Sequence, residues 1–367
     1  MKVLFDYQIF AMQQYGGISR YFFELIKRFE NSENDYLLGT KFTNNAYLNS
    51  NTFSNVYPFF PNFNFRGKER FIDLVNKSNT LRYVQKSDFD VFHPTYYDDY
   101  FFNNLGDKPY VVTFYDMIHE KFSDSFSDLK SLEKTIMQKS RIAKKAHRII
   151  AISEHTKNDI IDIYNIDKDK IDVVYLGNSL INTEQGEEAI VNDNYLLFVG
   201  NRSGYKNFSY FVKTISILLI ENKLKLVCGG GGNFSIEELN LLKDLGLQNH
   251  VVLIKEINDA ILSNLYTNAL FFVFPSLYEG FGIPVLESFA CNCPTLLSNG
   301  GSLPEIGGNG AVYFDLNDDQ SLFNAVFNLI NDAKLRNELI QQANIRLQNF
   351  SWDKTFEDTI KVYQKII

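Results

Sequence analysis

The sequence predicts an α/β protein built from two doubly wound, Rossmann-like domains. Its 367 residues exceed the roughly 250–300 at which a single hydrophobic core stops growing. Short apolar runs, typical of strands buried on both faces, alternate with amphipathic stretches typical of helices. The alternation stops at a polar, acidic interval over residues 178–188 and then begins again. We therefore expect one domain on each side of a linker.

In the first half, the apolar run at the amino terminus turns acidic at Asp6, which suits a first strand and not a signal peptide. The expected strands are Lys2–Phe5, Val91–His93, Tyr110–Phe114, Arg148–Ile152 and Asp172–Tyr175. The expected helices are Ile18–Phe29, Leu129–Ala146 and Glu154–Tyr164. Strands and helices in this order predict a parallel sheet with covered faces.

The second half repeats the pattern after a linker at residues 179–192. The expected strands are Tyr195–Val199, Leu224–Cys228, His250–Ile254, Leu270–Phe274, Thr295–Leu297 and Ala311–Phe314. Three helical stretches follow, starting near Leu322, Leu335 and Trp352. These elements predict a second domain over residues 193–351.

Composition limits the classes of function. No stretch approaches the roughly 20 uncharged residues of a membrane-spanning helix, so we expect a cytoplasmic protein. Cys228, Cys291 and Cys293 lie in apolar contexts, which suits buried thiols in a reducing compartment. The net charge of −8 comes from the second half, because residues 1–180 are neutral overall. Nucleic acid is therefore not an expected partner.

Two stretches of the first half are locally basic. One extends from Lys130 to Arg148, and the other, which is also aromatic, extends from Phe63 to Arg82. Such stretches form either solvated helix faces or an attachment surface for an anionic membrane, here the inner face of the cell membrane. The sequence leaves both interpretations open.

The most informative local feature is a pair of carboxylates, Glu279 and Glu287, on either side of a turn made of Gly280, Phe281 and Gly282. An apolar strand precedes the turn and a helix follows it. Glu279 is then expected at the carboxyl end of a parallel strand and Glu287 on the next helix. Both would face the crevice in which doubly wound sheets bind ligands.

Three glycine-containing loops complete the predicted site. Gly16 and Gly17 precede a helix that carries Arg20, so backbone N–H groups there suit an anion, although the loop lacks the dinucleotide-binding pattern. Between another strand and helix, Arg202 and Lys206 are expected to converge on a diphosphate. The third loop, residues 299–307, adds backbone donors near a helix start.

These motifs resemble those of retaining glycosyltransferases of family 4, and the resemblance covers nearly the whole chain. Glu279–Glu287 is similar to the family's Glu-x7-Glu motif, and Gly16-Gly17 to its glycine loop under the donor diphosphate. Arg202 and Lys206 resemble the family's basic phosphate pair, and Ser302-Leu303 begins a segment similar to the loop beside the donor. The resemblance implies the GT-B fold, with a donor domain at 193–351 and a terminal helix, 352–367, that crosses back onto the acceptor domain at 1–178.

The resemblance also implies an activity. Segments 92–97 and 116–120 are similar to those of bacterial transferases of O-antigen and capsule assembly, many of them mannosyltransferases. We therefore expect transfer of mannose or a related hexose from a GDP- or UDP-sugar to a saccharide or lipid-linked saccharide. No metal is expected, because cationic side chains can stabilise the leaving diphosphate. The string Asp88-Phe-Asp90 precedes a strand and so lies at the wrong end of the sheet for a metal in the crevice.

One position departs from the family pattern: Tyr115 precedes Asp116 where the relatives show His-Asp. That histidine lies near the transferred sugar, so Tyr115 is expected in the substrate site, with Asp116 and His119 as further catalytic candidates. His119 could also be an ordinary loop histidine. A GT-B phosphorylase, a nucleotide-sugar epimerase and a catalytically silent sugar-nucleotide-binding protein remain alternatives.

Overall fold

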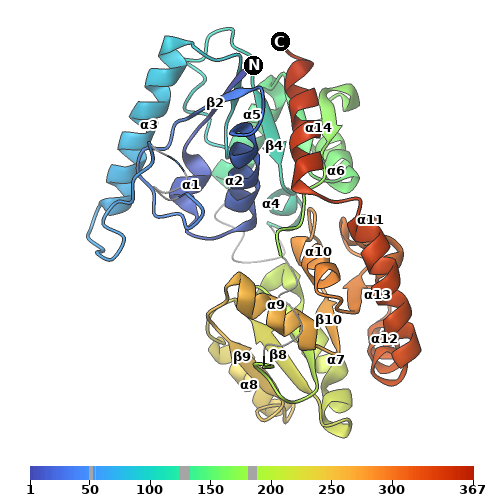
Figure 1. Cartoon of the computed structure of the whole chain (residues 1–367). Helices are drawn as coiled ribbons and strands as arrows, with labels where there is room; N and C mark the ends of the chain where they lie inside the picture. Colours follow the sequence, from blue (N-terminus) through green and yellow to red (C-terminus); the bar gives the residue numbers. More distant parts are fainter. Residues whose placement is uncertain (49–52, 54, 124–132, 181–187) are drawn as a thin grey trace. The chain divides into compact units, whose positions relative to one another are not determined.

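The computed structural model describes residues 1–48, 53, 55–123, 133–180 and 188–367. It divides into two compact units, one of Met1–Leu176 with Trp352–Ile367 and the other of Gly177–Ser351 (Figure 1). Both units are α/β with parallel sheets, so the predicted fold class is confirmed. Part of the predicted linker, residues 181–187, lies outside the described residues.

The first unit contains two three-stranded parallel sheets. One has the order β2 (Asp35–Leu38), β1 (Lys2–Phe5), β3 (Val91–His93), and the other β4 (Val111–Phe114), β5 (Arg148–Ala151), β6 (Ile171–Val173). A parallel bridge between Phe92 and Tyr110 connects them. The chain passes from β1 to β2 on one side and returns to β3 on the other. The carboxyl ends of β1 and β3 therefore form the switch point at which such sheets bind ligands.

The terminal helix α14 (Trp352–Gln364) belongs to this unit and packs against α2 (Gly17–Phe29) (Figure 1). Its Tyr363 hydroxyl lies 2.6 Å from Nδ1 of His93, whose Nε2 lies 3.0 Å from the Thr113 hydroxyl. His93 is fully buried, and burial lowers its pKa to about 3. The other helices are α1 (Gln8–Met12), α3 (Lys68–Lys86), α4 (Ile118–Phe122), α5 (Glu133–Lys145) and α6 (Glu154–Tyr164).

The second unit has one six-stranded parallel sheet of order β12-β11-β10-β7-β8-β9. In chain order its strands are β7 (Tyr195–Val199), β8 (Lys225–Gly229), β9 (Val251–Ile254), β10 (Phe271–Phe274), β11 (Thr295–Ser298) and β12 (Val312–Phe314). Its helices are α7 (Phe208–Glu221), α8 (Ile236–Asp244), α9 (Asp259–Asn268), α10 (Ile283–Ala290), α11 (Leu303–Gly307), α12 (Asp319–Asn331) and α13 (Ala333–Leu347). The switch point lies between β7 and β10, because the strand order reverses there.

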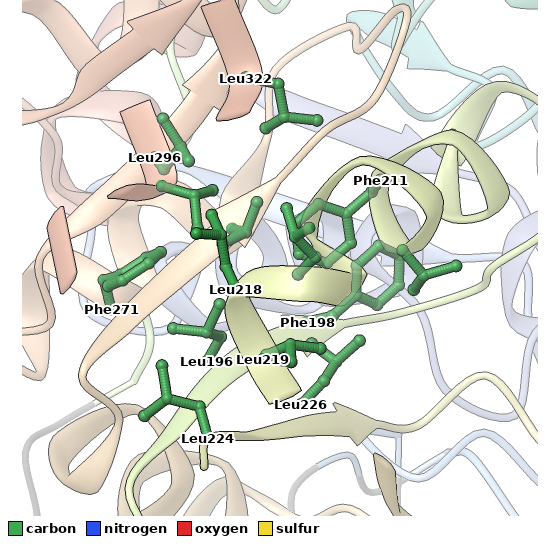
Figure 2. Close-up of a cluster of buried hydrophobic side chains, with 14 of the residues drawn as sticks. Leu196, Phe198, Phe211, Leu218, Leu219, Leu224, Leu226, Phe271, Leu296 and Leu322 are labelled. Carbon is green, nitrogen blue, oxygen red and sulfur yellow. The ribbon is translucent and has the colours of Figure 1, made fainter. Parts of the chain in front are cut away.

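The core of the second unit explains why its strands are apolar at successive positions. Figure 2 shows Leu196 and Phe198 of β7 packed with Phe211 of α7, and Leu322 of α12 belongs to the same buried cluster. On the opposite face, Tyr266 of α9 makes an edge contact with Phe272 of β10. Helices therefore cover both faces, as a doubly wound sheet requires.

In the described part of the first unit, the elements α1, β2, α3 and α4 are missing from the predicted ones. Helices α1 and α4 and the edge strand β2 have only four or five residues, too few for a periodic pattern to be recognised. Helix α3 is long, but its buried face includes Lys68, Asn76 and Thr80, so apolar residues do not mark it in the sequence. Of the predicted helix Leu129–Ala146, residues 133–145 are helical, and residues 129–132 lie outside the described part of the chain. All three cysteines are buried and free. Across the described residues, no helix is long and apolar enough to cross a membrane.

Candidate active site

An ion pair lies at the switch point of the second unit. Lys206 follows β7 and Glu279 follows β10, and their Nζ and Oε1 atoms are 2.6 Å apart. The two side chains are only 15% and 13% exposed. Burial lowers the pKa of the Lys206 ammonium, but the adjacent Glu279 carboxylate raises it, and the net pKa is raised. The structure thus keeps a lysine cation where a doubly wound sheet binds its ligand.

Ser302 fastens the loop that carries Glu279. Its backbone N–H and its hydroxyl both donate to the Glu279 carbonyl at 3.0 Å, and the hydroxyl also donates to the Phe281 carbonyl at 3.1 Å. Gly301 lets the two loops meet, because a Cβ there would lie 2.5 Å from the Glu279 carbonyl oxygen. On the other side, the Leu277 N–H donates to the Tyr205 carbonyl at 2.8 Å. The loops after β7, β10 and β11 are therefore held together around the ion pair.

Glu287 lies on α10, half-buried, with Oε2 accepting a hydrogen bond from the Tyr266 hydroxyl at 3.3 Å. Gly282 precedes this helix at a positive φ of 94°, which favours glycine. A Cβ at Gly282 would lie 2.9 Å from a methyl group of Leu303, whose side chain is fully buried. Leu303 therefore supports the turn with its side chain.

Phe281 and Gly280 complete that turn without exposing a side chain. The Phe281 ring is buried and packs edge-on against Phe350 of the same unit. Gly280 is also buried. The turn thus offers no side chain to a ligand, and the carboxylates of Glu279 and Glu287 flank it.

Arg202 has contacts that differ from the predicted ones. Its guanidinium donates to Glu238 at 3.0 Å and to the carbonyls of Gly230, Gly231, Gly232 and Asn233 at 2.9–3.3 Å. The three glycines have φ values of 72–75°, which turn their carbonyls toward the arginine. The predicted convergence of Arg202 and Lys206 is not present, because Arg202 is buried and binds its own loop while Lys206 binds Glu279.

In the first unit, Gly16 and Gly17 lie at the start of α2, as the sequence predicts. The Gln13 side chain covers this turn, since its Oε1 accepts the Ser19 N–H at 3.2 Å and occupies the space that a Cβ at Gly16 would need. Arg20 donates to Glu24 at 3.0 Å and lies over the Tyr47 ring.

The segment after β4 carries the remaining catalytic candidates. The Tyr115 ring is buried, with edge-on packing against Tyr21. Asp116 accepts from the Ile118 N–H at 3.1 Å, and its carbonyl accepts from Lys139 at 2.9 Å. Nδ1 of His119 is buried and has no hydrogen-bond partner among the described residues, and burial lowers the His119 pKa.

Several basic residues of the stretch from Lys130 to Arg148 are paired with carboxylates, and one of them, Lys139, is buried. Its side chain is 1% exposed and pairs with Glu120 at 2.9 Å, so it can neither be solvated nor reach a membrane. Arg141 pairs with Asp99 and Arg148 with Asp172, both at 2.6 Å. Lys130 lies outside the described residues.

A cavity of about 740 Å³ lies at the switch point of the first unit, and the sequence did not predict it. The residues that line it on the β1 and β3 side are Tyr7, Gln8, Tyr96, Tyr97 and Asp98, and α3 contributes Arg70 and Asp73. Beneath them Asp6 is fully buried and accepts from Thr95 and Gln8. The sequence signal that could have revealed this cavity is the run of polar and aromatic residues directly after β1 and β3.

The structure places Asp88 and Asp90 at the opposite end of this sheet. Asp88 pairs with the Lys2 ammonium at 3.0 Å, and Asp90 accepts the Lys2 backbone N–H at 2.7 Å, where β1 begins. In the described part of the chain, no group of three or more His, Cys, Asp or Glu side chains is arranged to hold a metal ion.

Comparisons with known proteins match both halves of the chain. The model "Glycosyltransferase Family 4" matches residues 15–180, and "Glycosyl transferases group 1" matches residues 181–346. The O-antigen chain mannosyltransferase RfbU of Salmonella typhimurium is 31% identical over 51% of this chain and 52% of its own length. The O-antigen chain mannosyltransferase B of Escherichia coli is 26% identical over 64% of each. The chain thus aligns with about half to two thirds of these curated relatives.

Solved structures match the fold over its whole length. Anabaena HepE in complex with UDP-glucose has a TM-score of 0.74 at 16% identity and covers 100% of both chains. Sucrose-phosphate synthase from Thermosynechococcus elongatus has a TM-score of 0.79 at 17% identity and covers 99% of this chain and 98% of its own. Two adjoining family models match the chain, both units contain parallel sheets, and the carboxylates of Glu279 and Glu287 flank the glycine turn. The chain belongs to the family 4 type of GT-B glycosyltransferases.

Proposed function

We propose that this protein transfers a hexose, with retention of anomeric configuration, from a nucleoside diphosphate sugar to a saccharide acceptor in cell-surface polysaccharide synthesis. The observation that carries the proposal is the Lys206–Glu279 pair at the switch point of the second unit. The O-antigen mannosyltransferase relatives support a mannose-containing donor, for which GDP-mannose is our first choice, and HepE in complex with UDP-glucose supports a UDP-hexose as the second choice.

Each charged group has a task in that reaction. As the bond from the anomeric carbon to the β-phosphate oxygen breaks and the oxygen of the acceptor hydroxyl bonds to that carbon, negative charge grows on the diphosphate, whose departing oxygen can take up the hydroxyl proton. The Lys206 ammonium meets this charge without having to be reoriented, because Glu279 and the fastened loops hold it in place. Glu279 then faces the sugar, and Glu287 accepts hydrogen bonds from the ribose hydroxyls.

A cation supplied by the protein can do the work of a metal at the leaving group. We therefore propose that transfer needs no divalent ion. Activity that is unchanged in EDTA supports this, and activity that magnesium or manganese restores contradicts it.

The cavity of the first unit suits the acceptor. Its volume lies in the range of small-molecule sites, about 300–1,000 Å³. Tyr7 and Tyr96 offer aromatic faces to the C–H side of a sugar ring, while Asp73 and Asp98 can accept hydrogen bonds from hydroxyls. The Tyr7 hydroxyl already donates to Asp73 at 2.8 Å, which fixes both side chains.

The test is release of nucleoside diphosphate from GDP-mannose, UDP-glucose and UDP-N-acetylgalactosamine, with and without a saccharide acceptor. Turnover by wild type that is lost in Lys206→Gln and kept in Lys213→Gln, an exposed lysine of α7, supports the assignment. Production of a sugar 1-phosphate only when inorganic phosphate is added indicates a phosphorylase. Conversion of the donor to its epimer indicates an epimerase. Binding without turnover indicates a silent sugar-nucleotide-binding protein.

A further inference from the structure

An exposed aromatic surface lies beside the acceptor cavity in the first unit. Its members come from the loop before α3 and from the first turns of that helix: Tyr57, Phe60, Phe63, Phe65, Phe71 and Leu74. Their exposed fractions run from 39% for Phe65 to 65% for Leu74. We call these six residues the aromatic surface. Grouped exposed apolar side chains of this kind mark a contact with a partner or a membrane.

The aromatic surface has a fixed shape. Lys68 is buried and donates its ammonium hydrogens to the carbonyls of Phe60 and Phe63 at 2.8 and 3.0 Å. The Asn44 side chain holds Phe59 through two hydrogen bonds of 3.1 and 3.2 Å, and the Phe59 ring stacks on Phe71. Phe60 itself adopts a φ of 44°, a conformation that bulky residues rarely take. A buried lysine and a strained phenylalanine thus display phenyl rings to the outside.

Charge around the aromatic surface favours an anionic lipid partner. Arg66 and Arg70 lie next to the aromatic surface, Lys68 is buried beneath it, and Lys77, Arg82 and Lys86 follow along the rest of α3, while the acids between residues 57 and 86 are Glu69 and Asp73. This region is positive although the whole chain has a net charge of −8. Aromatic side chains bordered by arginine and lysine suit the boundary between headgroups and acyl chains. In the other basic stretch Lys139, Arg141 and Arg148 are paired with carboxylates, and its exposed lysines, Lys134, Lys144 and Lys145, are not accompanied by exposed phenylalanine, tyrosine or tryptophan side chains among the described residues of that stretch.

The aromatic surface lies close to the acceptor cavity, so a membrane contact there can bring a substrate to that cavity. A second cavity, of about 330 Å³, is lined by Pro61 and Asn64 of the aromatic loop and shares Ala11, Met12 and Glu69 with the acceptor cavity. Leu74 of the aromatic surface also lines the acceptor cavity. The two cavities are therefore neighbours, one beside the loop and the other at the switch point.

We propose that the aromatic surface docks this protein onto an anionic lipid bilayer, so that the acceptor cavity receives the saccharide head of a lipid-linked acceptor from the membrane. Phe60 and Phe63 enter the region below the headgroups, and Arg66 contacts lipid phosphates. The docking is inferred from the aromatic surface and does not depend on the proposed function. The delivery of a lipid-linked acceptor rests on the proposed function.

The docking is tested by sedimentation with vesicles of phosphatidylethanolamine and phosphatidylglycerol, without donor or acceptor. We expect the double variant Phe60→Ser, Phe63→Ser to lower the partition coefficient on the order of tenfold or more. The matched control is Ile217→Ser, Ile220→Ser, which removes two exposed apolar side chains from α7, 52% and 44% exposed, and should sediment like wild type. Arg66→Gln should weaken binding to anionic vesicles more than to neutral ones.

A second variant tests the docking without placing a polar side chain on the aromatic surface, so a failure to fold cannot explain its result. Phe63→Trp places an indole on the aromatic surface, and the chain's one native tryptophan, Trp352, is only 4% exposed. The fluorescence of the new indole should shift to the blue on addition of vesicles and be quenched by lipids brominated near the headgroup.

Three results overturn the proposal: wild type that stays in the supernatant, a double variant that sediments like wild type, or a Phe63→Trp variant whose emission does not shift with vesicles. If sedimentation velocity instead shows a dimer that the double variant abolishes, the aromatic surface is an interface between two copies. If wild type docks onto vesicles but does not turn over water-soluble donor and acceptor, the proposed function is contradicted. The docking is unaffected by that result.

Discussion

Lys206 and Glu279 lie 73 positions apart in the sequence, and the structure brings their charged atoms to 2.6 Å at the point where the sheet of the second unit reverses its strand order. The pair is largely buried, so each partner sets the electrostatic state of the other. The lysine is kept protonated by the glutamate, and the glutamate is kept in one position by the lysine.

Glu279 and Glu287 should differ in their kinetic effects. If Glu279 meets charge that develops at the sugar, Glu279→Gln should lower kcat on the order of 10²–10³-fold. If Glu287 binds ribose equally before and during reaction, as proposed, Glu287→Gln should mainly raise the KM for donor. Steady-state kinetics with varied donor measures both. Exchanged effects would mean that the two roles are exchanged.

The alkaline limit of nucleoside diphosphate binding should move when Glu279 is replaced. In wild type the carboxylate offsets the effect of burial and raises the pKa of Lys206. In Glu279→Gln burial remains and the offset is lost, so the Lys206 pKa should fall and its cation should be lost at lower pH. Binding of nucleoside diphosphate, followed by calorimetry from neutral to alkaline pH, should weaken earlier in the variant. A profile that does not move would separate Lys206 from diphosphate binding.

Substitutions of Lys206 and Arg202 should have different effects, one on ligand affinity and the other on stability. Loss of a charge-assisted bond to phosphate costs about 1.5–3 kcal/mol, so Lys206→Gln should raise the Kd for nucleoside diphosphate roughly ten- to hundredfold. Arg202→Lys should instead lower the Tm, because lysine cannot satisfy four carbonyls and Glu238. A normal Tm with a large rise in Kd for Arg202→Lys would restore the phosphate role that the sequence predicts.

Lys139 and Glu120 should contribute to stability as a pair. Both side chains are nearly fully buried, at 1% and 2% exposure. Lys139→Met leaves the Glu120 charge unpaired, which costs about 3–5 kcal/mol and should lower the Tm by roughly 10 °C. Adding Glu120→Gln should recover part of the loss. If the single variant melts like wild type, Glu120 is not held as a charge.

His93 should make the first unit sensitive to acid. Its pKa is about 3 in the fold against 6.5 when exposed, so the unfolded state binds the proton first. The stability that neutral His93 provides is full above pH 6.5 and falls at lower pH, with a slope of up to about 1.4 kcal/mol per unit. Asp6, whose pKa burial raises, acts in the opposite direction because its protonated form is favoured in the fold. The difference in Tm between wild type and His93→Gln, measured from pH 7.5 to 5, isolates the histidine and should shrink as the pH falls.

Local pattern is sufficient to single out several residues of the candidate site. Glu279 and Glu287 are recognisable because an apolar run, a glycine turn and a helix start occur in consecutive residues, and each is a short-range signal. Lys206 is recognisable in the same way, from a loop between a strand and a helix. The alternation of apolar runs and helices also predicted strands such as Tyr195–Val199 and Lys2–Phe5 with the observed bounds. These features depend on backbone geometry that a few neighbouring residues decide.

Local residue patterns predict the two parallel α/β units and the residues that follow their strands, because burial on both faces requires continuous apolar runs and the ends of parallel strands must meet at one edge. The pairing of the charged side chains, in contrast, depends on tertiary packing. Arg202 binds glycine carbonyls some 30 positions away, Lys139 binds Glu120, and Leu303 supports Gly282, and none of these partners is adjacent in sequence. A buried cation must take whichever acceptor the packing brings close, because leaving it unpaired away from water is costly. For that reason a basic residue in a loop could be recognised from the sequence, while its partner could not.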